Sequence, residues 1–580
     1  MEDLTVRETF VRNTRMTHKK TFFSTSYLLV VGIASLLVLW TINDGELGGI
    51  ADTYAHTMIG VFFADFIRDG AFLNNPKNMM DYIWNYYAHY NNIALLHWPH
   101  LFHLVEGTFF LIFGISEPVA RLVSYFFFLL GLTYFYRLLR VMFDDLTAVL
   151  ASILLVTSPI MLFMARTVSL EIPSVSLSLI ATYYFYVYVR EARLLDVILT
   201  AIFTGLALLT KQTSLYLLVF FFLFSLYKYG QEKRVFFAWR HLIIFVAIVI
   251  ILSAPYYIAS FFFHSDVIFK DSFKGFQHYL SIHIYLYYLV TLPEQLSWTT
   301  IVLLVFYLLS LITPLGRPVR GQEIFLLLWA ASCYLLFTVL GSKEPRYIIY
   351  WVPSLCGLAA LPVLRLAAQL SSRTARGTLV LVGLVAVFSA ATLTEAAFTP
   401  RSRVSGNEEV ARFLLSQIPP DREEIVFFDG DYSAYGALVF ATRKADPDRR
   451  LYLFRSNKFL YAIAIFPHYA LWEIRTKDEE IKEFFRKYGI RYICIHFMPV
   501  ADWEKLPALS TLRTMMLTDP DFVLVKKFPI VFQLDHGGDP SRQQGELLLY
   551  EYRKATSVPL DLDLELPMPS IGKTITIRLR

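Results

Sequence analysis

The sequence predicts an α-helical polytopic membrane protein that carries a soluble α/β domain at its C-terminal end. Of its 580 residues, 56% are hydrophobic and 17% are charged, which is far from the balance of soluble proteins. Up to residue 398 the apolar residues form runs of about 20, the length that crosses a bilayer. Beyond it no run is long enough, and helical patterns alternate with strand patterns. We therefore expect a transmembrane domain over 1–398 and an α/β domain over 399–580.

A basic N-terminal arm precedes the first apolar run and carries Arg7, Arg12, Arg15, Lys19 and Lys20. No small-residue cleavage site follows, so the run is predicted to be a retained anchor and not a signal peptide. The net charge of +5 comes with Lys and Arg clustered in short segments between apolar runs, as membrane topology requires. No nucleic-acid partner is expected.

About eleven apolar runs are predicted to cross the membrane as helices. They cover residues 22–42, 119–136, 148–163, 173–189, 194–209, 215–226, 242–261, 298–312, 324–340, 348–364 and 378–397. A twelfth run, 101–115, has about 15 residues and contains His103 and Glu106, which suits an interfacial helix better than a crossing. If it does not cross, the basic segments all fall on one side, which the positive-inside rule assigns to the cytoplasm.

This topology predicts a plasma (inner) membrane protein with a cytoplasmic N-terminus and an extracytoplasmic C-terminal domain. The first outer loop, 43–121, is expected to hold two or three amphipathic interfacial helices, such as 79–90 and 101–115. The outer face also receives ionisable residues from the ends of several apolar runs: Asp52, Arg166, Glu171, Lys211, Lys343, Glu344 and Arg346.

The C-terminal domain is predicted to alternate helices and strands as a small α/β unit does. We expect helices at 407–417 and 478–487, and strands at 425–428, 451–454 and 492–496. The first strand ends at Asp429-Gly430-Asp431-Tyr432, where open α/β sheets tend to bind ligands. An ordinary turn at the end of a strand explains the same residues.

Each candidate site residue has a structural alternative. Asp52 also suits a solvated loop, although Tyr54 adds a hydrogen-bonding aromatic ring beside it. Glu171 and Arg166 also suit a pair that caps the helix starting near Pro173. Lys211 interrupts an apolar hairpin, as a snorkelling lysine does.

Lys343, Glu344 and Arg346 also suit a surface turn. Together with the other outer residues they suit the mouth of one cavity, in which cations hold a phosphate and a carboxylate takes a proton.

Several other kinds of site are not supported by the sequence. His97-Trp98-Pro99-His100 and His103 suggest a metal site, but proline interrupts the helix there and no cysteine is near. No Gly-x-x-x-x-Gly-Lys loop and no Gly-x-Ser-x-Gly motif occurs, so nucleotide hydrolysis and serine-type acyl transfer are unsupported. We expect no cofactor and assign no metal ligand, and the dependence on a divalent metal stays open.

Over residues 22–397 the sequence resembles the GT-C membrane glycosyltransferases, in the branch of protein O-mannosyltransferases and lipid A aminoarabinose transferases. The resemblance rests on the order of short motifs. These are Asp52 after the first span, His97-Trp98-Pro99-His100-Leu101, Phe113-Gly114 with Glu117 and Arg121, Ala165-Arg166 with Glu171, Gly205-Leu206-Ala207-Leu208-Leu209-Thr210-Lys211, and Lys343-Glu344-Pro345-Arg346-Tyr347.

Three positions depart from the family pattern. Thr53 follows Asp52 where the family often has Glu, His100 replaces a second proline, and Glu171 stands where the family more often has Asp.

The resemblance implies that a sugar moves, with inversion, from a polyprenyl-phosphate carrier to an acceptor at the outer face. It implies Asp52 as the general base, and Arg346, Lys211 and Lys343 as ligands of the carrier phosphate. Glu171 and Arg166 would orient the acceptor or the sugar. The same motifs place Tyr54, His97 and Tyr347 among the residues that bind substrate. The identity of the sugar stays open, and the acceptor can be a lipid, a glycan or a protein.

A secondary transporter or a lipid flippase is the main alternative from another class. Transporters carry paired repeats and charges near the membrane midplane, whereas this sequence shows no repeat and gathers its charges at one face. A scaffold that only presents the C-terminal domain would leave those outer charges without a role.

Overall fold

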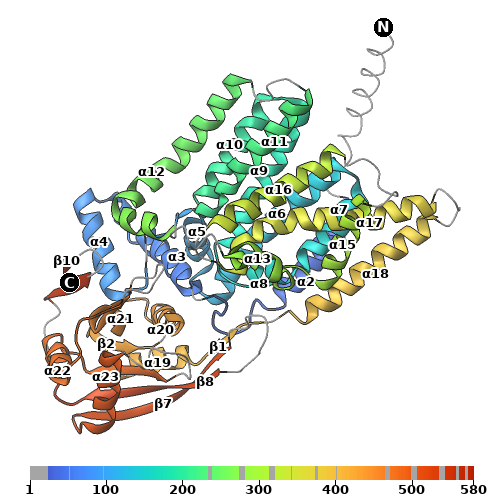
Figure 1. The fold of residues 1–580 in the computed structure, drawn as a ribbon. Coiled ribbons are helices and arrows are strands. Elements are labelled where there is room, and N and C mark those ends of the chain that lie inside the picture. Colours follow the sequence, from blue (N-terminus) through green and yellow to red (C-terminus); the bar gives the residue numbers. More distant parts are fainter. Residues whose placement is uncertain are drawn as a thin grey trace.

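The computed structural model describes residues 24–50, 52–93, 95, 97–232, 238–272, 281–312, 320–340, 343–371, 377–399, 401–430, 432–463, 471–497, 506–533, 543–556, 561–568 and 573–579. A bundle of long helices forms one part, and a domain built on a β-sheet forms the other (Figure 1). Both predicted parts are therefore present.

Every predicted apolar run contains a helix. The helices are α2 (Thr25–Leu39), α6 (Glu117–Met142), α7 (Asp145–Val156), α8 (Pro159–Ala165), α9 (Glu171–Glu191), α10 (Leu194–Leu208), α11 (Tyr216–Glu232), α12 (Trp239–Ser272), α15 (Trp298–Ile312), α16 (Gly321–Val339), α17 (Val352–Ser371) and α18 (Gly377–Ala397). Short helices α13 (Ile282–Val290) and α14 (Leu292–Gln295) precede α15.

Among the described residues, six helices are long and apolar enough to cross a membrane, or seven if one bent pair counts as a span. Five shorter apolar helices accompany them, so the number of eleven crossings stays a prediction.

The run at 148–163 is not the single helix that we expected. It divides into α7 and α8, which are bent by 68° relative to each other. Ser158 at the break has extended backbone (φ −61°, ψ 126°) because Pro159 follows it. Proline disfavours a helical conformation in the preceding residue and lacks the N–H that would continue the helix.

The segment predicted to be the first outer loop contains three helices, α3 (Thr53–Arg68), α4 (Pro76–His89) and α5 (Leu101–Phe113). A short 3-10 helix, η1 (Ala71–Leu73), joins α3 to α4. The 13 residues of α5 extend over only about 20 Å, less than the roughly 30 Å of a bilayer core. This length agrees with the prediction that the segment does not cross.

The C-terminal domain contains a six-stranded mixed sheet with the order β1-β7-β8-β6-β2-β3. Strands β2 (Glu424–Asp429), β3 (Leu451–Arg455) and β6 (Tyr492–Phe497) are parallel. Strands β1 (Arg403–Ser405), β7 (Phe522–Gln533) and β8 (Gln543–Tyr552) extend the sheet with antiparallel pairing.

The other elements of this domain are α19 (Asn407–Gln417), α20 (Tyr432–Ala445), α21 (Ser456–Phe459), α22 (Asp478–Lys487), α23 (Pro507–Thr518) and the strand pairs β4 (Tyr461–Ile463) with β5 (Leu471–Glu473) and β9 (Asp563–Met568) with β10 (Lys573–Arg578). Both predicted helices and all three predicted strands are found, within one residue at each end.

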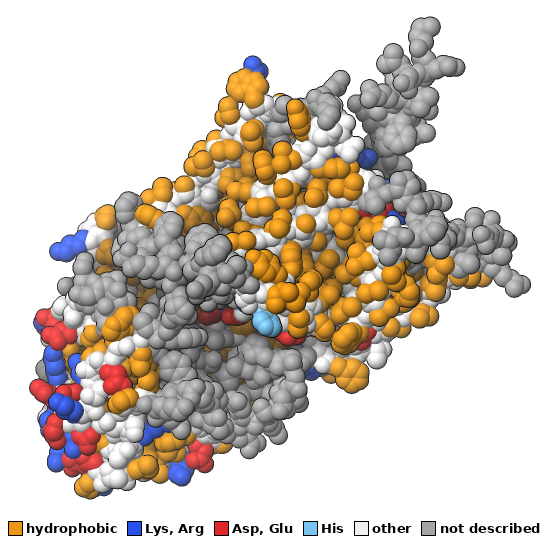
Figure 2. Space-filling model, in the orientation of Figure 1, with side chains coloured by type: hydrophobic (Ala, Val, Ile, Leu, Met, Phe, Trp, Pro, Cys, Tyr) orange, Lys and Arg blue, Asp and Glu red, His pale blue; other side chains and the backbone are white. Residues whose placement is uncertain are grey.

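The surface differs between the two parts. Figure 2 shows hydrophobic side chains over the visible face of the helix bundle, whereas Lys, Arg, Asp and Glu gather on the sheet domain. Exposed apolar residues of the bundle include Leu36, Ile251 and Val387, at 75%, 71% and 63% exposure. A face of this kind is suited to lipid and costs free energy in water.

The C-terminal domain docks on the helices of the first outer loop through a buried ion pair. Arg443 of α20 donates from Nε and Nη2 to both carboxylate oxygens of Asp65 in α3, at 2.8 and 2.7 Å. The two side chains are 4% and 1% exposed. At position 436 of α20 a Cβ would collide with the Cβ of Tyr54, so glycine lets α20 approach the start of α3 closely. The domain is thereby held beside Asp52.

Replacing Arg443 with alanine is expected to loosen this docking, because the buried Asp65 would lose its only buried cation among the described residues and keep only the half-exposed Arg68 and the hydroxyl of Tyr86. Removing one partner of a buried pair costs about 3–5 kcal/mol. The thermal unfolding midpoint of Arg443→Ala should fall clearly, whereas Arg486→Ala, which removes an exposed partner of Glu479, should leave it nearly unchanged. Equal midpoints for the two variants would contradict this role of the pair.

The predicted topology can be checked with single cysteines, because the native Cys333, Cys356 and Cys494 are all buried. We expect Arg412→Cys, in α19, to react with an impermeant maleimide in intact cells. Cysteines at 234 and 373, which lie outside the described residues, should react only after the membrane is opened. Labelling of position 412 only after permeabilisation would reverse the assignment of sides.

Candidate active site

Four separate turns bring charged side chains together at one end of the helix bundle. Asp52 immediately precedes α3, and Glu171 is the first residue of α9. Lys211 lies between α10 and the 3-10 helix η2 (Gln212–Leu215), and Arg346 lies in the 3-10 helix η4 (Pro345–Trp351). Because these residues contact one another, they share one side of the bundle, as the loop charges predicted.

Arg346 joins three carboxylates. Its Nη2 lies 3.3 Å from Oδ2 of Asp52, and its Nε lies 2.5 Å from Oε2 of Glu344 and 3.8 Å from Oε1 of Glu171. The guanidinium thus connects the first outer loop with the starts of α9 and η4.

Lys211 provides a second cation, which contacts the same oxygen of Glu171 as Arg346 does. Its Nζ donates to Oε1 of Glu171 at 2.6 Å. Glu171 is only 2% exposed, whereas Asp52 is 24% exposed. Glu171 is therefore enclosed by its cations, whereas Asp52 stays within reach of an incoming molecule.

Tight packing fixes the segment that carries Asp52. Gly49 has φ +127°, and a Cβ there would collide with the side chain of Thr167. The segment before Asp52 is thus pressed against the turn that leads to Glu171. The acid at the start of α9 also suits the positive end of the helix dipole.

Tyr347 lies in the same group. Its hydroxyl donates to Oε1 of Glu344 at 3.2 Å, and the Nζ of Lys211 lies 5.6 Å from the centre of its ring. Glu344 was missing from the predicted substrate-binding set, although its place two residues before Arg346 was a signal for it.

His56 was a second omission, and its position one helical turn after Asp52 was the signal that could have found it. Its ring interacts electrostatically with the charged groups of Asp52, Glu171, Lys211 and Arg346. The Nδ1 atom of His56 lies 3.1 Å from Nε2 of His103. Burial lowers the pKa of His56 to about 4, so this ring is neutral near pH 7.

Four other predicted site residues, Tyr54, His97, Lys343 and Arg166, have contacts with residues outside the group of Asp52, Glu171, Lys211 and Arg346. The hydroxyl of Tyr54 donates to the Leu47 carbonyl at 2.5 Å and its ring packs on Phe440. His97 packs edge-on against Trp98, which in turn contacts His56.

Lys343 donates to the carbonyls of Phe337 and Thr338, at 2.5 and 2.6 Å, and so caps the C-terminal end of α16. Burial lowers the pKa of Lys343 to about 8.

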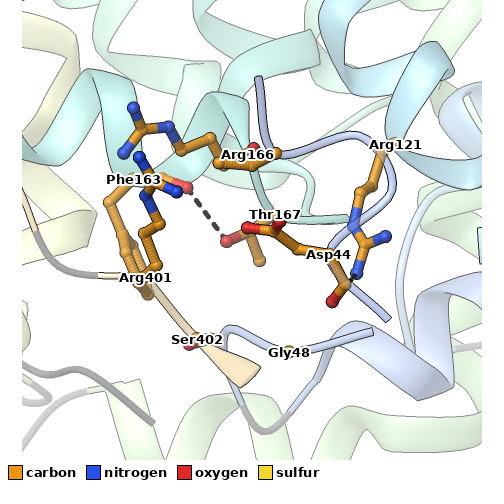
Figure 3. Close-up of a pocket in the computed structure, with 9 residues that line it drawn as sticks. Asp44, Gly48, Arg121, Phe163, Arg166, Thr167, Arg401 and Ser402 are labelled. Atoms are coloured by element: carbon orange, nitrogen blue, oxygen red, sulfur yellow. Dashed lines mark hydrogen bonds between the residues drawn. The ribbon is translucent and has the colours of Figure 1, made fainter. Parts of the chain in front are cut away.

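Arg166 does not pair with Glu171, contrary to the capping alternative. It donates Nε and Nη2 to the Leu37 carbonyl, at 3.1 and 2.8 Å, and lines a different pocket (Figure 3). Helix α8 ends at Ala165, so the chain turns between Arg166 and Glu171 and directs the two side chains apart.

The strand end at Asp429 forms a buried polar cluster. Ser456 donates to Oδ1 of Asp429 at 2.6 Å, and Nη2 of Arg513 lies 3.8 Å from Oδ2. Burial raises the pKa of Asp429 to about 6. Asp431 lies outside the described residues, and the ligand pocket expected at this turn stays a prediction.

Comparison with known proteins gives one match to a family model. Residues 98–258 match the family model described as dolichyl-phosphate-mannose-protein mannosyltransferase. The match includes Glu171 and Lys211 and stops short of Asp52 and Arg346. None of the curated proteins matches the chain.

Solved structures cover much more of the chain. ArnT from Cupriavidus metallidurans bound to undecaprenyl phosphate superimposes with a TM-score of 0.54 and 14% identity, over 90% of this chain and 97% of ArnT. The chain has the GT-C fold. This assignment confirms the fold expected from the resemblance.

Two further structures share the GT-C fold. The apo state of the same ArnT gives a TM-score of 0.54 at 13% identity, over 92% of this chain and 99% of ArnT. The oligosaccharyltransferase of Archaeoglobus fulgidus in complex with Zn and sulfate gives 0.50 at 12% identity, over 81% of this chain and 68% of that chain. At sequence identities this low, the structural similarity shows a shared fold and nothing about shared activity.

Proposed function

We propose that this protein is a membrane glycosyltransferase that moves a sugar from a polyprenyl-phosphate carrier to a hydroxyl group of an acceptor. The observation that carries the proposal is the cluster in which Arg346 stands between Asp52, Glu171 and Glu344, with Lys211 beside Glu171. The cluster combines a reachable carboxylate with two cations, which are the groups that this transfer requires.

The proposed general base is Asp52. Of the three acids that contact Arg346, Glu171 is almost fully buried, and Glu344 is already held by Nε of Arg346 at 2.5 Å and by the hydroxyl of Tyr347 at 3.2 Å. Glu171 touches both cations and is almost fully buried, so we assign it a positioning role. A carboxylate enclosed by two cations is a poor proton acceptor, because their charges stabilise its ionised form.

The cations act on the leaving group. A phosphate that departs from a sugar needs positive charge and not a general acid. Arg346 presents a planar fork that matches phosphate geometry, and Lys211 adds a second positive charge. Both are largely shielded from water, at 14% and 12% exposure, which strengthens their electrostatic interactions.

One displacement then completes the reaction. The acceptor O–H bond breaks, and its proton passes to Asp52 while the oxygen attacks the anomeric carbon. The bond from that carbon to the phosphate oxygen breaks, and its electron pair stays on the phosphate beside Arg346. Attack opposite the leaving group inverts the anomeric centre.

Related proteins support the carrier class. The matched family is described as using dolichyl-phosphate-mannose, and ArnT was solved with undecaprenyl phosphate. We place the reaction at the outer face, on the same side as the C-terminal domain, because the basic loops are assigned to the cytoplasm.

The direct test is transfer from radiolabelled polyprenyl-phosphate sugars by the purified protein, with lipid, glycan and peptide acceptors in separate reactions. Labelled product with wild-type protein and none with Asp52→Asn would support the proposal. Equal labelling with both proteins would refute the assigned site, and the absence of any product with any combination of donor and acceptor would refute the carrier class.

A further inference from the structure

Arginines from three parts of the chain line a pocket beside the C-terminal end of α2 (Figure 3). Arg121 comes from α6, Arg166 follows α8, and Arg401 lies in the segment that leads from α18 to β1. The pocket holds about 320 Å³ not filled by protein atoms, part of it open to solvent. Its other lining residues are Thr41, Asp44, Gly48, Phe163, Thr167 and Ser402.

Positive side chains predominate in the described lining of this arginine pocket. Among these described residues, three are arginines and one, Asp44, is an acid. Burial, together with the charge of Arg401, lowers the pKa of Arg166 to about 10. Guanidinium groups that converge on one cavity match the charge and the planar geometry of an anion such as a phosphate.

Unsatisfied polar atoms also face this region. Among the described residues, Nη1 of Arg166, Oδ2 of Asp44 and Oγ of Ser402 are buried without a hydrogen-bond partner. Such atoms are rare in folded proteins, because each costs free energy unless a ligand or water satisfies it. Together they offer at least one donor for an anion and one acceptor for a hydroxyl group.

Arg121 has a different part in the pocket. Its guanidinium is buried and donates to the carbonyls of Ile42, Gly45 and Glu46, at 2.9, 3.1 and 2.8 Å. It therefore shapes the loop that carries Asp44 and contributes its charge. Arg166 and Arg401 are the residues whose replacement tests binding.

The pocket lies where the chain is expected to leave the membrane. Trp40 follows the last residue of α2 and is 73% exposed, a position typical of tryptophan at the bilayer interface. The guanidinium of Arg401 lies 6.0 Å from its ring centre. Lipid headgroups lie at the bilayer interface, where the predicted topology puts Trp40.

We propose that the arginine pocket binds the phosphate of an anionic lipid headgroup, with Arg166 and Arg401 on the phosphate and Asp44 accepting a headgroup hydroxyl. This site is distinct from the Asp52–Arg346 cluster and does not depend on the proposed transfer reaction. Gly48 lines the pocket, and Asp52 follows four residues later, within about 14 Å at full extension. A bound lipid would therefore stabilise the segment that carries Asp52.

The test is a thermal-shift titration of the detergent-purified full-length protein carrying Arg346→Gln, so that the candidate donor site contributes little. The probes are short-chain phosphatidylglycerol, short-chain phosphatidylcholine as the zwitterionic control, and inorganic phosphate against chloride at equal ionic strength. The same titrations in the wild-type background guard against misfolding of the Arg346 variant.

We expect phosphatidylglycerol to raise the unfolding midpoint more than phosphatidylcholine does. Arg401→Gln and Arg166→Gln should each raise the phosphatidylglycerol concentration that gives half of this shift by about tenfold. Arg412→Gln replaces an exposed arginine of the C-terminal domain and should leave that concentration unchanged. A response to inorganic phosphate that needs the same two arginines would support the anion site and identify free phosphate as a second source. No response to either probe, or responses unchanged in both pocket variants, would overturn the proposal.

Discussion

Asp52→Asn is expected to lower turnover by about 100-fold or more while leaving the protein folded. The substitution keeps the size of the side chain and one carbonyl oxygen for Arg346, but an amide does not accept a proton from the acceptor. General base catalysis contributes about 10²–10⁴-fold to rates. Initial rates at saturating donor and acceptor measure the loss, and the unfolding midpoint checks that the fold is intact.

Asp81→Asn is the matched control, since Asp81 is an exposed acid of α4 in the same outer loop. It should retain full activity. If Asp52→Asn keeps a rate within a few-fold of wild type, Asp52 has no part in proton transfer. Glu344, at 44% exposure and in contact with the same arginine, would be the next acid to test.

Arg346→Lys is expected to raise the donor concentration needed for half-maximal rate by about 10- to 100-fold, although the positive charge is kept. A lysine cannot offer the two parallel N–H groups with which arginine holds a phosphate, and hydrogen bonds to charged groups contribute about 1.5–3 kcal/mol each. Lys211→Ala should have a smaller effect in the same direction. The acceptor dependence should change much less than the donor dependence.

Arg365→Lys controls for loss of an arginine within the helix bundle. Arg365 pairs with Glu323 at the start of α16, away from the turns that hold Asp52, and its replacement should leave donor use unchanged. Unchanged donor dependence in both Arg346→Lys and Lys211→Ala would place the carrier phosphate elsewhere. Lys343, the remaining predicted phosphate ligand, would then be tested despite its contacts with α16 carbonyls.

The sequence determined the elements of the fold to a large extent, because burial in a membrane or a core imposes local patterns. Helices form at every apolar run, and α19 and α22 begin and end at the predicted residues. The membrane requires long continuous apolar helices, and a half-buried helix requires apolar residues at a helical period. These requirements act within one segment, so they can be read without knowing what the segment contacts.

The sequence also predicted that Asp52, Glu171, Lys211 and Arg346 lie on one side of the bundle, because loop charges indicate orientation one span at a time. It did not determine which residues at that end touch. Arg166 and Lys343 satisfy backbone carbonyls of Leu37 and α16, and their place in the sequence does not distinguish them from Lys211.

Only the tertiary structure decided those partners. Contacts between side chains depend on how helices pack and how turns bend over distances of many residues, as Arg346 and Asp52 show across 294 positions. The same reason applies to the arginine pocket, whose three arginines are far apart in the chain and converge only where α2, α6, α8 and the start of the C-terminal domain meet.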